Sequence, residues 1–171
     1  MNDANKFFGK YRGVVIDNVD LLQTGRLLVQ VTDVTNILPS TWATPCLPFA
    51  GIQSGLHALP EIGSQVWVEF EQGDLDSPIW VGGFWGSAAE VPALALAGPP
   101  ELQQVVVQTA DQNTLLISDV PGPTGGILLK SSAGAFISVS DTGITISNGQ
   151  GATITMNGPA VTINEGALEV I

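Results

Sequence analysis

Residues that could carry out acid–base, nucleophilic or metal chemistry are scarce in this sequence of 171 residues. It contains one His, one Cys and one Tyr, with five Lys and Arg against 16 Asp and Glu. A zinc site of several Cys or a cluster of His ligands cannot form within one such chain. The formal net charge of -11 repels phosphates, which argues against a protein that binds nucleic acid or anionic membranes. We therefore expect no metal, no cofactor and no enzymatic activity.

The remaining candidate groups have simpler structural interpretations. His57 precedes an Ala-Leu-Pro segment, and we interpret it as a structural or exposed side chain rather than as a ligand or base. Cys46 lies in an apolar stretch, so we expect it to behave as a small buried hydrophobe. Glu69 and Glu71 alternate along one strand and could form an acid–base pair, although a solvated strand face explains them more simply.

The elements that would position these residues fall into four segments: an N-terminal arm (1–9), a domain (10–86), a linker (87–101) and a C-terminal domain (102–171). The first domain contains all four Trp residues. The linker is rich in Ala and Pro, and its Pro residues favour an irregular segment over a short helix. The C-terminal domain has no Trp, Tyr, His or Arg, and instead repeats short apolar bursts.

The first domain has the pattern of a small all-β barrel. Val66, Val68 and Phe70 alternate with polar neighbours, and the turn-rich stretch after them favours a hairpin. Five short strands are typical of a closed barrel, of which the OB-fold is the commonest kind. The predicted strands are Tyr11–Asp17, Gly25–Val31, Trp42–Phe49, Gln65–Glu71 and Pro78–Trp85.

Polar and aromatic residues of this barrel also have structural interpretations. Asp74 and Asp76 flank a turn, which Asx-type hydrogen bonds stabilise without calcium. Four aromatic side chains could stack on the bases of a single-stranded nucleic acid, namely Trp67, Trp80, Phe84 and Trp85. The sequence has only two Arg residues, Arg12 and Arg26, and is strongly acidic. For the aromatic residues we therefore favour barrel packing or a contact between chains over nucleic-acid binding.

The C-terminal domain repeats a unit of one strand and one turn. Apolar residues two positions apart are followed by Gly, Asn, Asp or Ser, and the unit recurs mostly every seven to ten residues. Such a repeat is too short for a propeller blade and favours a β-helix or a stacked β-prism. The apolar pairs are Ile127 and Leu129, Ile137 and Val139, Ile144 and Ile146, Ile154 and Met156, Val161 and Ile163, and Leu168 and Val170.

One chain offers no obvious cover for the apolar side of these strands. Each buried aliphatic side chain contributes roughly 1.5–3 kcal/mol, so twelve contribute on the order of 20–35 kcal/mol as an upper bound. We therefore predict a homotrimer whose chains turn this side to a common axis; the alternative is a flat antiparallel sheet packed on the first domain. The predicted axial residues are Ile127, Leu129, Ile137, Val139, Ile144, Ile146, Ile154, Met156, Val161 and Ile163.

The sequence also resembles a known family. Tyr11–Asp17, the Gly-Arg-Leu at 25–27 and the Trp-Ala-Thr-Pro-Cys at 42–46 resemble the start of baseplate assembly protein V, the OB-fold part of phage tail spikes and of VgrG spike proteins. The strongest portion is 58–86, with a Pro-x-x-Gly loop, an alternating strand, a Gly-Asp turn and a Pro-Ile-Trp-Val-Gly strand. The repeats of 102–171 resemble, more loosely, the β-helical needle of that family.

This resemblance implies a structural central spike of a contractile injection system, such as a phage tail, a tailocin or an extracellular injection particle. It implies a homotrimer that attaches to a hub beneath the inner tube and contacts the target membrane only transiently, during puncture. Because few residues precede the barrel, we expect the hub to be a separate protein. The implied location is cytoplasmic assembly, followed by incorporation into a phage tail-like particle.

The resemblance is incomplete at the end of the needle. Some family needles end in a His-x-His iron site, whereas the single His of this chain is His57 in the first domain. The apolar end formed by Leu168, Val170 and Ile171 instead suggests docking of a PAAR-type tip protein. Two other functions stay open at this stage: an OB-fold nucleic-acid binder, and a β-helical enzyme acting on polysaccharide, for which the scattered acids of 102–171 provide little support.

Overall fold

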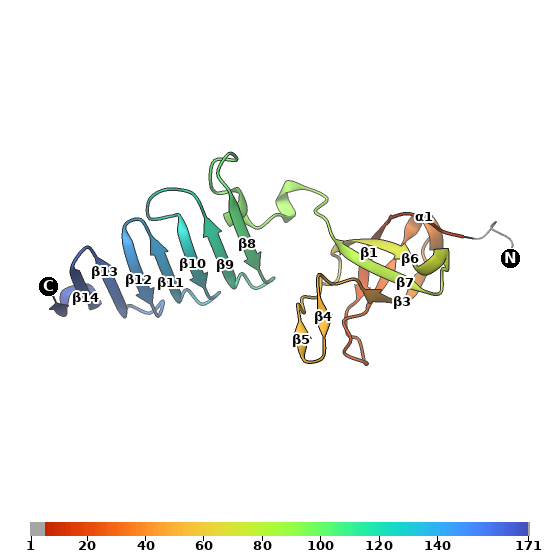
Figure 1. The fold of residues 1–171 in the computed structure, drawn as a ribbon, viewed down its shortest axis with the longest axis horizontal. Helices are drawn as coiled ribbons and strands as arrows, with labels where there is room; N and C mark the ends of the chain where they lie inside the picture. Colours follow the sequence, from red (N-terminus) through yellow and green to blue (C-terminus); the bar gives the residue numbers. More distant parts are fainter. Residues whose placement is uncertain (1–5, 171) are drawn as a thin grey trace. The chain divides into compact units, whose positions relative to one another are not determined.

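The computed structural model describes residues 6–170 and is mostly β-structure (Figure 1). The chain divides into two compact units, Met1–Gly86 and Ser87–Ile171. Within the described residues, the longest α-helix is the four-residue α1, Thr32–Thr35, and none could cross a membrane.

The first unit is a closed five-stranded barrel of the OB type. Its strands are β1 (Tyr11–Asp17), β2 (Leu27–Gln30), β3 (Pro39–Pro45), β6 (Gln65–Phe70) and β7 (Pro78–Gly83). They follow the order β1-β2-β3-β7-β6, and β6 pairs again with β1. The β3–β7 pairing is parallel, while the other barrel pairings are antiparallel. This arrangement leaves no free sheet edge in the barrel.

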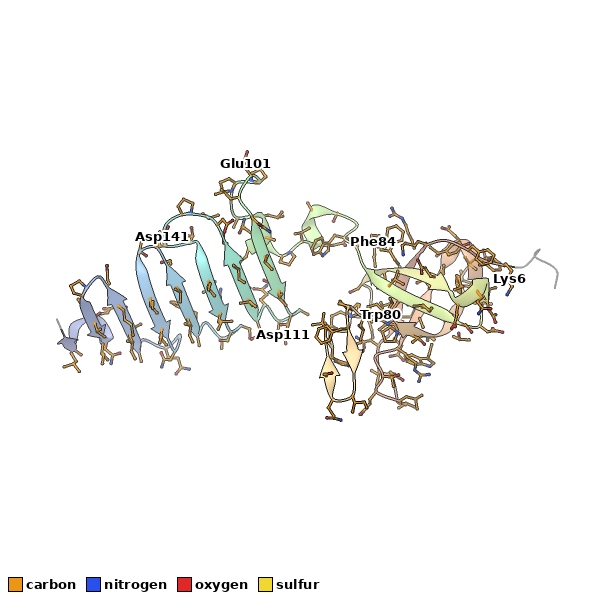
Figure 2. All side chains as sticks on the ribbon, in the orientation of Figure 1. Lys6, Trp80, Phe84, Glu101, Asp111 and Asp141 are labelled. Atoms are coloured by element: carbon orange, nitrogen blue, oxygen red, sulfur yellow. The ribbon has the colours of Figure 1, made fainter. Side chains whose placement is uncertain are left out.

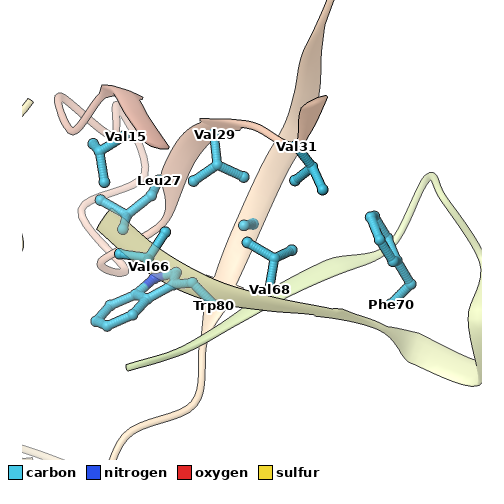
Figure 3. Packing of buried hydrophobic residues seen from close by; sticks show 9 residues of the cluster. Val15, Leu27, Val29, Val31, Val66, Val68, Phe70 and Trp80 are labelled. Atoms are coloured by element: carbon cyan, nitrogen blue, oxygen red, sulfur yellow. The ribbon is translucent and has the colours of Figure 1, made fainter. Parts of the chain in front are cut away.

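The barrel core is built from alternate residues of its strands (Figure 3). Val66 and Val68 are fully buried and Phe70 nearly so, which confirms the predicted alternation of β6. The indole Nε1 of Trp80 donates to the carbonyl oxygen of Gly25 at 3.0 Å, so this buried polar atom has a partner. The remaining core residues are Val15, Leu27, Val29, Val31 and Ala43.

Four of the five predicted barrel strands differ in their bounds from those observed, and β2 and β7 are simply shorter than predicted. The strand expected at Trp42–Phe49 lies earlier, in β3, and ends at Pro45 because a second Pro follows shortly and the chain turns outward. A separate hairpin follows, formed by β4 (Ala50–Gly51) and β5 (Ser54–Gly55). The last predicted residue of β6, Glu71, instead begins the 3-10 turn η2 (Glu71–Gly73).

The second unit is one antiparallel sheet of eight strands in which each strand pairs with its neighbours in sequence (Figure 1). Its strands are β8 (Gln104–Gln108), β9 (Thr114–Ser118), β10 (Gly126–Lys130), β11 (Phe136–Ser140), β12 (Gly143–Ser147), β13 (Thr153–Asn157), β14 (Ala160–Ile163) and β15 (Leu168–Val170). The 3-10 turn η5 (Asn164–Gly166) joins the last two. Six of these strands carry the predicted apolar pairs, and β8 and β9 extend the same pattern toward the N-terminus.

The segment expected to be an irregular linker contains two 3-10 turns, η3 (Ala88–Glu90) and η4 (Ala93–Leu96). The second of these lies against β8. A short helical turn is compatible with the Ala-Leu run because Pro92 precedes it and Pro99 follows it.

The sheet of one chain is a meander of hairpins rather than a β-helix that winds on itself. Antiparallel pairing is what the sequence-based alternative of a flat sheet predicted for one chain. A β-helix or prism built from several chains stays a prediction, which the arrangement of side chains on this sheet helps to evaluate.

Candidate trimerisation surface

Cross-strand register places the apolar residues of the second unit in two continuous columns. Ile127 pairs with Ile117 on one side and Val139 on the other, and Leu129 pairs likewise with Leu115 and Ile137. Residues paired across strands point to the same face of a sheet. Column one is Val105, Ile117, Ile127, Val139, Ile144, Met156 and Val161; column two is Val107, Leu115, Leu129, Ile137, Ile146, Ile154, Ile163 and Leu168.

These columns are incompletely covered in the single chain. Val107 is 62% exposed, Leu129 48%, Ile137 43% and Ile146 37%. Figure 2 draws the described side chains of this sheet as sticks. Ten of the column residues are 37–62% exposed and the other described ones are less exposed, so the two columns forgo on the order of 10 kcal/mol of hydrophobic free energy. A whole domain is typically stable by only about 5–15 kcal/mol, so this surface is large enough to determine assembly.

The opposite face changes character along the sheet. Its central positions are apolar in the first strands, where Val106 pairs with Leu116 and Leu116 with Leu128. Leu116 is only 4% exposed, and the turn η4 lies against the neighbouring β8. From β11 onward the same column is polar and uncharged through Ser138, Thr145, Thr155 and Thr162.

Two glycines allow strands to begin close to their neighbours. Gly126 and Gly143 are the first residues of β10 and β12 and have φ of +79° and +137°. A Cβ at Gly126 would lie 2.0 Å from the carbonyl oxygen of Val139, and one at Gly143 would lie 2.2 Å from that of Met156. A side chain at either position would force the neighbouring strand away and disturb the columns.

Side-chain oxygens also tie successive turns of the sheet together. Asn113 Oδ1 accepts from the backbone N–H of Ser132 at 3.1 Å, and Asp141 Oδ2 accepts from that of Gly122 at 3.2 Å. Each tie links turns that are 19 residues apart in the chain. They hold neighbouring hairpins at a fixed spacing, in addition to the strand ladder.

The predicted axial residues all lie in the two columns. The sequence interpretation missed the four column positions of β8 and β9, namely Val105, Val107, Leu115 and Ile117. Their spacing of two residues was the available signal, but unbroken apolar runs from Val105 to Val107 and from Leu115 to Ile117 obscured the alternation. Whether three chains share an axis at these residues is not tested by one chain, so their axial role stays a prediction.

The predicted tip residues lie at or beyond the last strand. Leu168 begins β15 and is 55% exposed. Val170 ends β15, paired with Val161, and Ile171 lies outside the described residues. β15 pairs with β14 on one side and ends the strand order, so its other edge is the end of the sheet.

The candidate chemical groups of the barrel are not brought together. Cys46 is exposed, which corrects the expectation of a buried side chain; it follows the end of β3, and only its backbone N–H pairs inward, with Trp80 at 2.8 Å. His57 is exposed, in the loop that follows β5. No cluster of three or more His, Cys, Asp or Glu that could hold a metal occurs in residues 6–170.

The carboxylates of the β6–β7 connection serve structural purposes. Glu69 forms an ion pair with Lys10, whereas Glu71 lies in η2, so the two do not form a pair on one strand face. Asp74 Oδ1 accepts from the backbone N–H of Asp76 at 3.1 Å, which confirms the predicted Asx-type turn.

The aromatic residues that could have stacked on bases divide between core and surface. Trp80 is 5% exposed and belongs to the barrel core. Trp67 and Phe84 stack at 4.7 Å between centroids, and the guanidinium of Arg12 lies 5.2 Å from the Trp67 ring and 4.9 Å from Phe84. Trp85 is 61% exposed. Arg12 is thus held against aromatic rings rather than arranged with other cations along a nucleic-acid groove.

A buried carboxylate that sequence interpretation missed organises the loop between β1 and β2. Asp20 accepts hydrogen bonds from the backbone N–H groups of Leu22 and Thr24, and Arg26 donates to it at 2.6 Å. The Arg26 hydrogen bond is the main cause that holds the pKa of Asp20 far below its usual range, and the Thr24 and Leu22 bonds add to it. Asp20 in turn raises the pKa of Arg26 through the same hydrogen bond. The spacing Asp20-x-x-x-Thr24-x-Arg26 was the only signal in the sequence.

Both units match described protein families. Residues 11–85 match the "Type VI secretion system/phage-baseplate injector OB domain". Residues 104–169 match the "Phage baseplate V C-terminal trimerisation domain". No curated protein matches the chain.

The barrel and the repeated sheet together therefore define a structural protein of the phage baseplate and injector class. The chain belongs to the phage baseplate V family. The matched trimerisation domain supports a homotrimer, and baseplate membership is consistent with a component of a phage tail-like particle. Both matched families are structural, in agreement with the expectation of a protein without catalytic activity.

Proposed function

We propose that three copies of this chain form the central spike of a contractile injection system, with residues 102–171 as its needle. The observation that carries this proposal is the pair of apolar columns, which run along the sheet and remain partly exposed in one chain. Three sheets that turn their columns to one axis bury them in a β-prism. The ten axial residues predicted above then lie in its interior.

The proposed needle suits mechanical penetration. Eight strands about 4.8 Å apart extend over roughly 38 Å and remain paired along that whole length. In the proposed trimer, Ser138, Thr145, Thr155 and Thr162 lie on the outer wall, whose central column is polar without being charged from β11 to β14. Such a wall binds neither anionic lipid nor cell-wall polymer strongly. The spike attaches to a separate hub beneath the inner tube and helps to puncture the target envelope when the sheath contracts.

The end of the needle is a docking site for a separate tip protein of the PAAR type. Leu168 is apolar and more than half exposed, and β15 ends the sheet with one strand edge unpaired in this chain. Deleting 166–171 is expected to remove the tip from purified particles while the trimer still assembles. Recovery of the tip on particles of the deleted chain would contradict this docking site.

The needle proposal is tested by Ile146→Asp, with Thr145→Asp as the matched control. Ile146 belongs to column two, and Thr145 lies next to it on the opposite face. In the proposed trimer the first change places three carboxylates near one axis, where desolvation and repulsion are severe. The second change places them on the outer wall. Native mass spectrometry of the full chain is expected to show loss of the trimer only for Ile146→Asp.

A further inference from the structure

Two loops of the barrel leave it at the same end and lie beside one another. The β1–β2 loop (18–26) and the segment with the β4–β5 hairpin (46–57) are called the loop pair below. The amide Nδ2 of Asn18 donates to the carbonyl oxygen of Pro60 at 3.0 Å. A Cβ at Gly25 would lie 3.4 Å from Leu59 and 3.6 Å from Pro45, the residues that flank the hairpin segment. In Figure 1 the β4–β5 hairpin projects away from the barrel wall.

The loop pair presents apolar side chains to solvent at its tips. Ile52 is 97% exposed and Leu21 is 91% exposed, the two highest values among the large apolar residues of the described chain. Loop tips normally carry polar residues. Four further exposed apolar side chains belong to the same two loops: Val19, Leu22, Phe49 and Leu56.

In the β1–β2 loop, the carboxylate of Asp20 is buried while Leu21 and Leu22 are exposed. Asp20 is buried and accepts hydrogen bonds from Leu22, Thr24 and Arg26, so the acid between Val19 and Leu21 does not reach the surface. These bonds fix the loop before any partner arrives. A rigid apolar surface loses little conformational entropy on binding, as a preorganised interface requires.

The loop pair carries no net charge of its own. Its charged residues are Asp20 and Arg26, and they form an ion pair with each other. Asp17 and Glu61 lie outside the two loops, so the exposed apolar tips hold no acidic side chain that would repel another copy of this acidic chain.

The chain leaves the barrel at the loop-pair end. β7 runs from Pro78, paired with Phe70, to Gly83, paired with Val66 near the start of β6. The start of β6 also lies beside the end of β1, where the β1–β2 loop begins. The trimerisation domain begins at residue 104, a short distance along the chain. In a trimer, short linkers hold the three barrels near one another. Each barrel then meets the others at an effective concentration in the millimolar range, so even a weak contact between barrels forms.

We propose that the loop pair is a second contact between copies of this chain, in which the loop pairs of the three barrels pack against one another. This contact rests on the homotrimer but not on the hub, the tip protein or the puncture function. It shields Leu21 and Ile52 from water and limits the freedom of the barrels that the linker alone would allow.

Cross-linking of the full chain tests this contact. In a Cys46→Ser background, Ile52→Cys places one thiol in the loop pair, and Ile37→Cys places one at an exposed site (83%) at the opposite end of the barrel. A short bis-maleimide is expected to link the Ile52→Cys chains into covalent dimers, the largest product that one thiol per chain allows, with at least tenfold less product from Ile37→Cys. Both sites are so exposed that neither substitution disturbs the barrel core.

The outcomes separate this contact from the needle proposal. A trimer by native mass spectrometry whose Ile52→Cys chains cross-link no more than Ile37→Cys would overturn the loop-pair contact and leave the needle intact. A monomer would overturn both. If the Ile52→Cys thiol of the trimer reacts freely with maleimide and is shielded only after a hub protein or a lipid vesicle is added, the occupant is that partner and the contact between copies is wrong.

Discussion

Strands of both units alternate apolar and polar residues, but the two units cover the resulting apolar face in different ways. In the barrel, alternate residues of β6 are 0–6% exposed because the five strands wrap around them. In the sheet, alternate residues such as Leu129 and Ile137 remain 48% and 43% exposed, because the eight strands form an open meander. Alternation therefore identifies the apolar face of a strand. Whether the chain itself or other copies cover that face depends on whether the sheet closes.

The largest effect is expected from a charge in the barrel core. Val68→Asp buries a carboxylate among Val66, Phe70 and Trp80 and costs roughly 4–5 kcal/mol or more, a large part of the stability of a small domain. Because all four Trp residues lie between positions 42 and 85, intrinsic fluorescence reports on the barrel alone. We expect an unfolded barrel attached to an intact trimer, as measured by fluorescence and native mass spectrometry. Loss of the trimer would show that the two units are not independent.

The next comparison is the dependence of stability on protein concentration. Each tenfold dilution removes about 1 kcal/mol per chain from a trimer, which lowers the apparent Tm of a unit of this size by roughly 4–8 °C. Hydrogen exchange of 104–163 should show this shift. The fluorescence transition of the barrel should move much less, since its core lies within one chain. If the unfolding transition of the sheet does not shift with protein concentration, other copies do not cover its apolar face.

Glycine substitutions sharpen the comparison inside the sheet. Gly126→Ala adds a Cβ that meets the carbonyl oxygen of Val139, at a φ of +79°, and is expected to cost about 2 kcal/mol or more. Gly158→Ala is the matched control, because Gly158 also has a positive φ but no atom within 4 Å of an added Cβ. Denaturant unfolding followed by hydrogen exchange of 104–163 measures both. Equal destabilisation would mean that backbone strain alone, and not strand spacing, makes glycine necessary.

The smallest expected effect is the pH dependence of the barrel. The lowered pKa of Asp20 means that its carboxylate stabilises the fold at pH values above the ordinary Asp range, near 4, and that this stabilisation is lost progressively as the pH falls below it. Asp20→Asn should lower the fluorescence Tm at pH 7, and the difference from the unsubstituted chain should shrink toward pH 2. A difference that does not depend on pH would assign the effect to loop packing rather than to the charge.

Much of the barrel could be predicted from the sequence because its strands alternate cleanly and its turns contain Gly and Asp. β1 was predicted with its observed bounds, Tyr11–Asp17. β3 was placed too late because the apolar residues after Pro45 suggested a continuing strand, although they lie in an outward loop. Local pattern does not distinguish an apolar residue in the core from one at an exposed loop tip such as Ile52.

The columns of the sheet were predictable in type but not in extent. Ile144 and Ile146 revealed the apolar face because Thr145 separates them, whereas Val105 and Val107 were hidden by Val106 between them. The role of Asp20 was not predictable, since its partners Leu22, Thr24 and Arg26 meet only when the loop folds back on itself. Hydrogen bonds of this kind depend on backbone geometry that residue types alone do not specify.

The most direct test of the account is the mass of the full chain in solution at micromolar concentration, measured by native mass spectrometry. Closure of the two apolar columns by other copies predicts a single species of three chains. A stable, folded monomer whose segment 104–163 is protected from hydrogen exchange would contradict the account, because one chain would then cover its own apolar face.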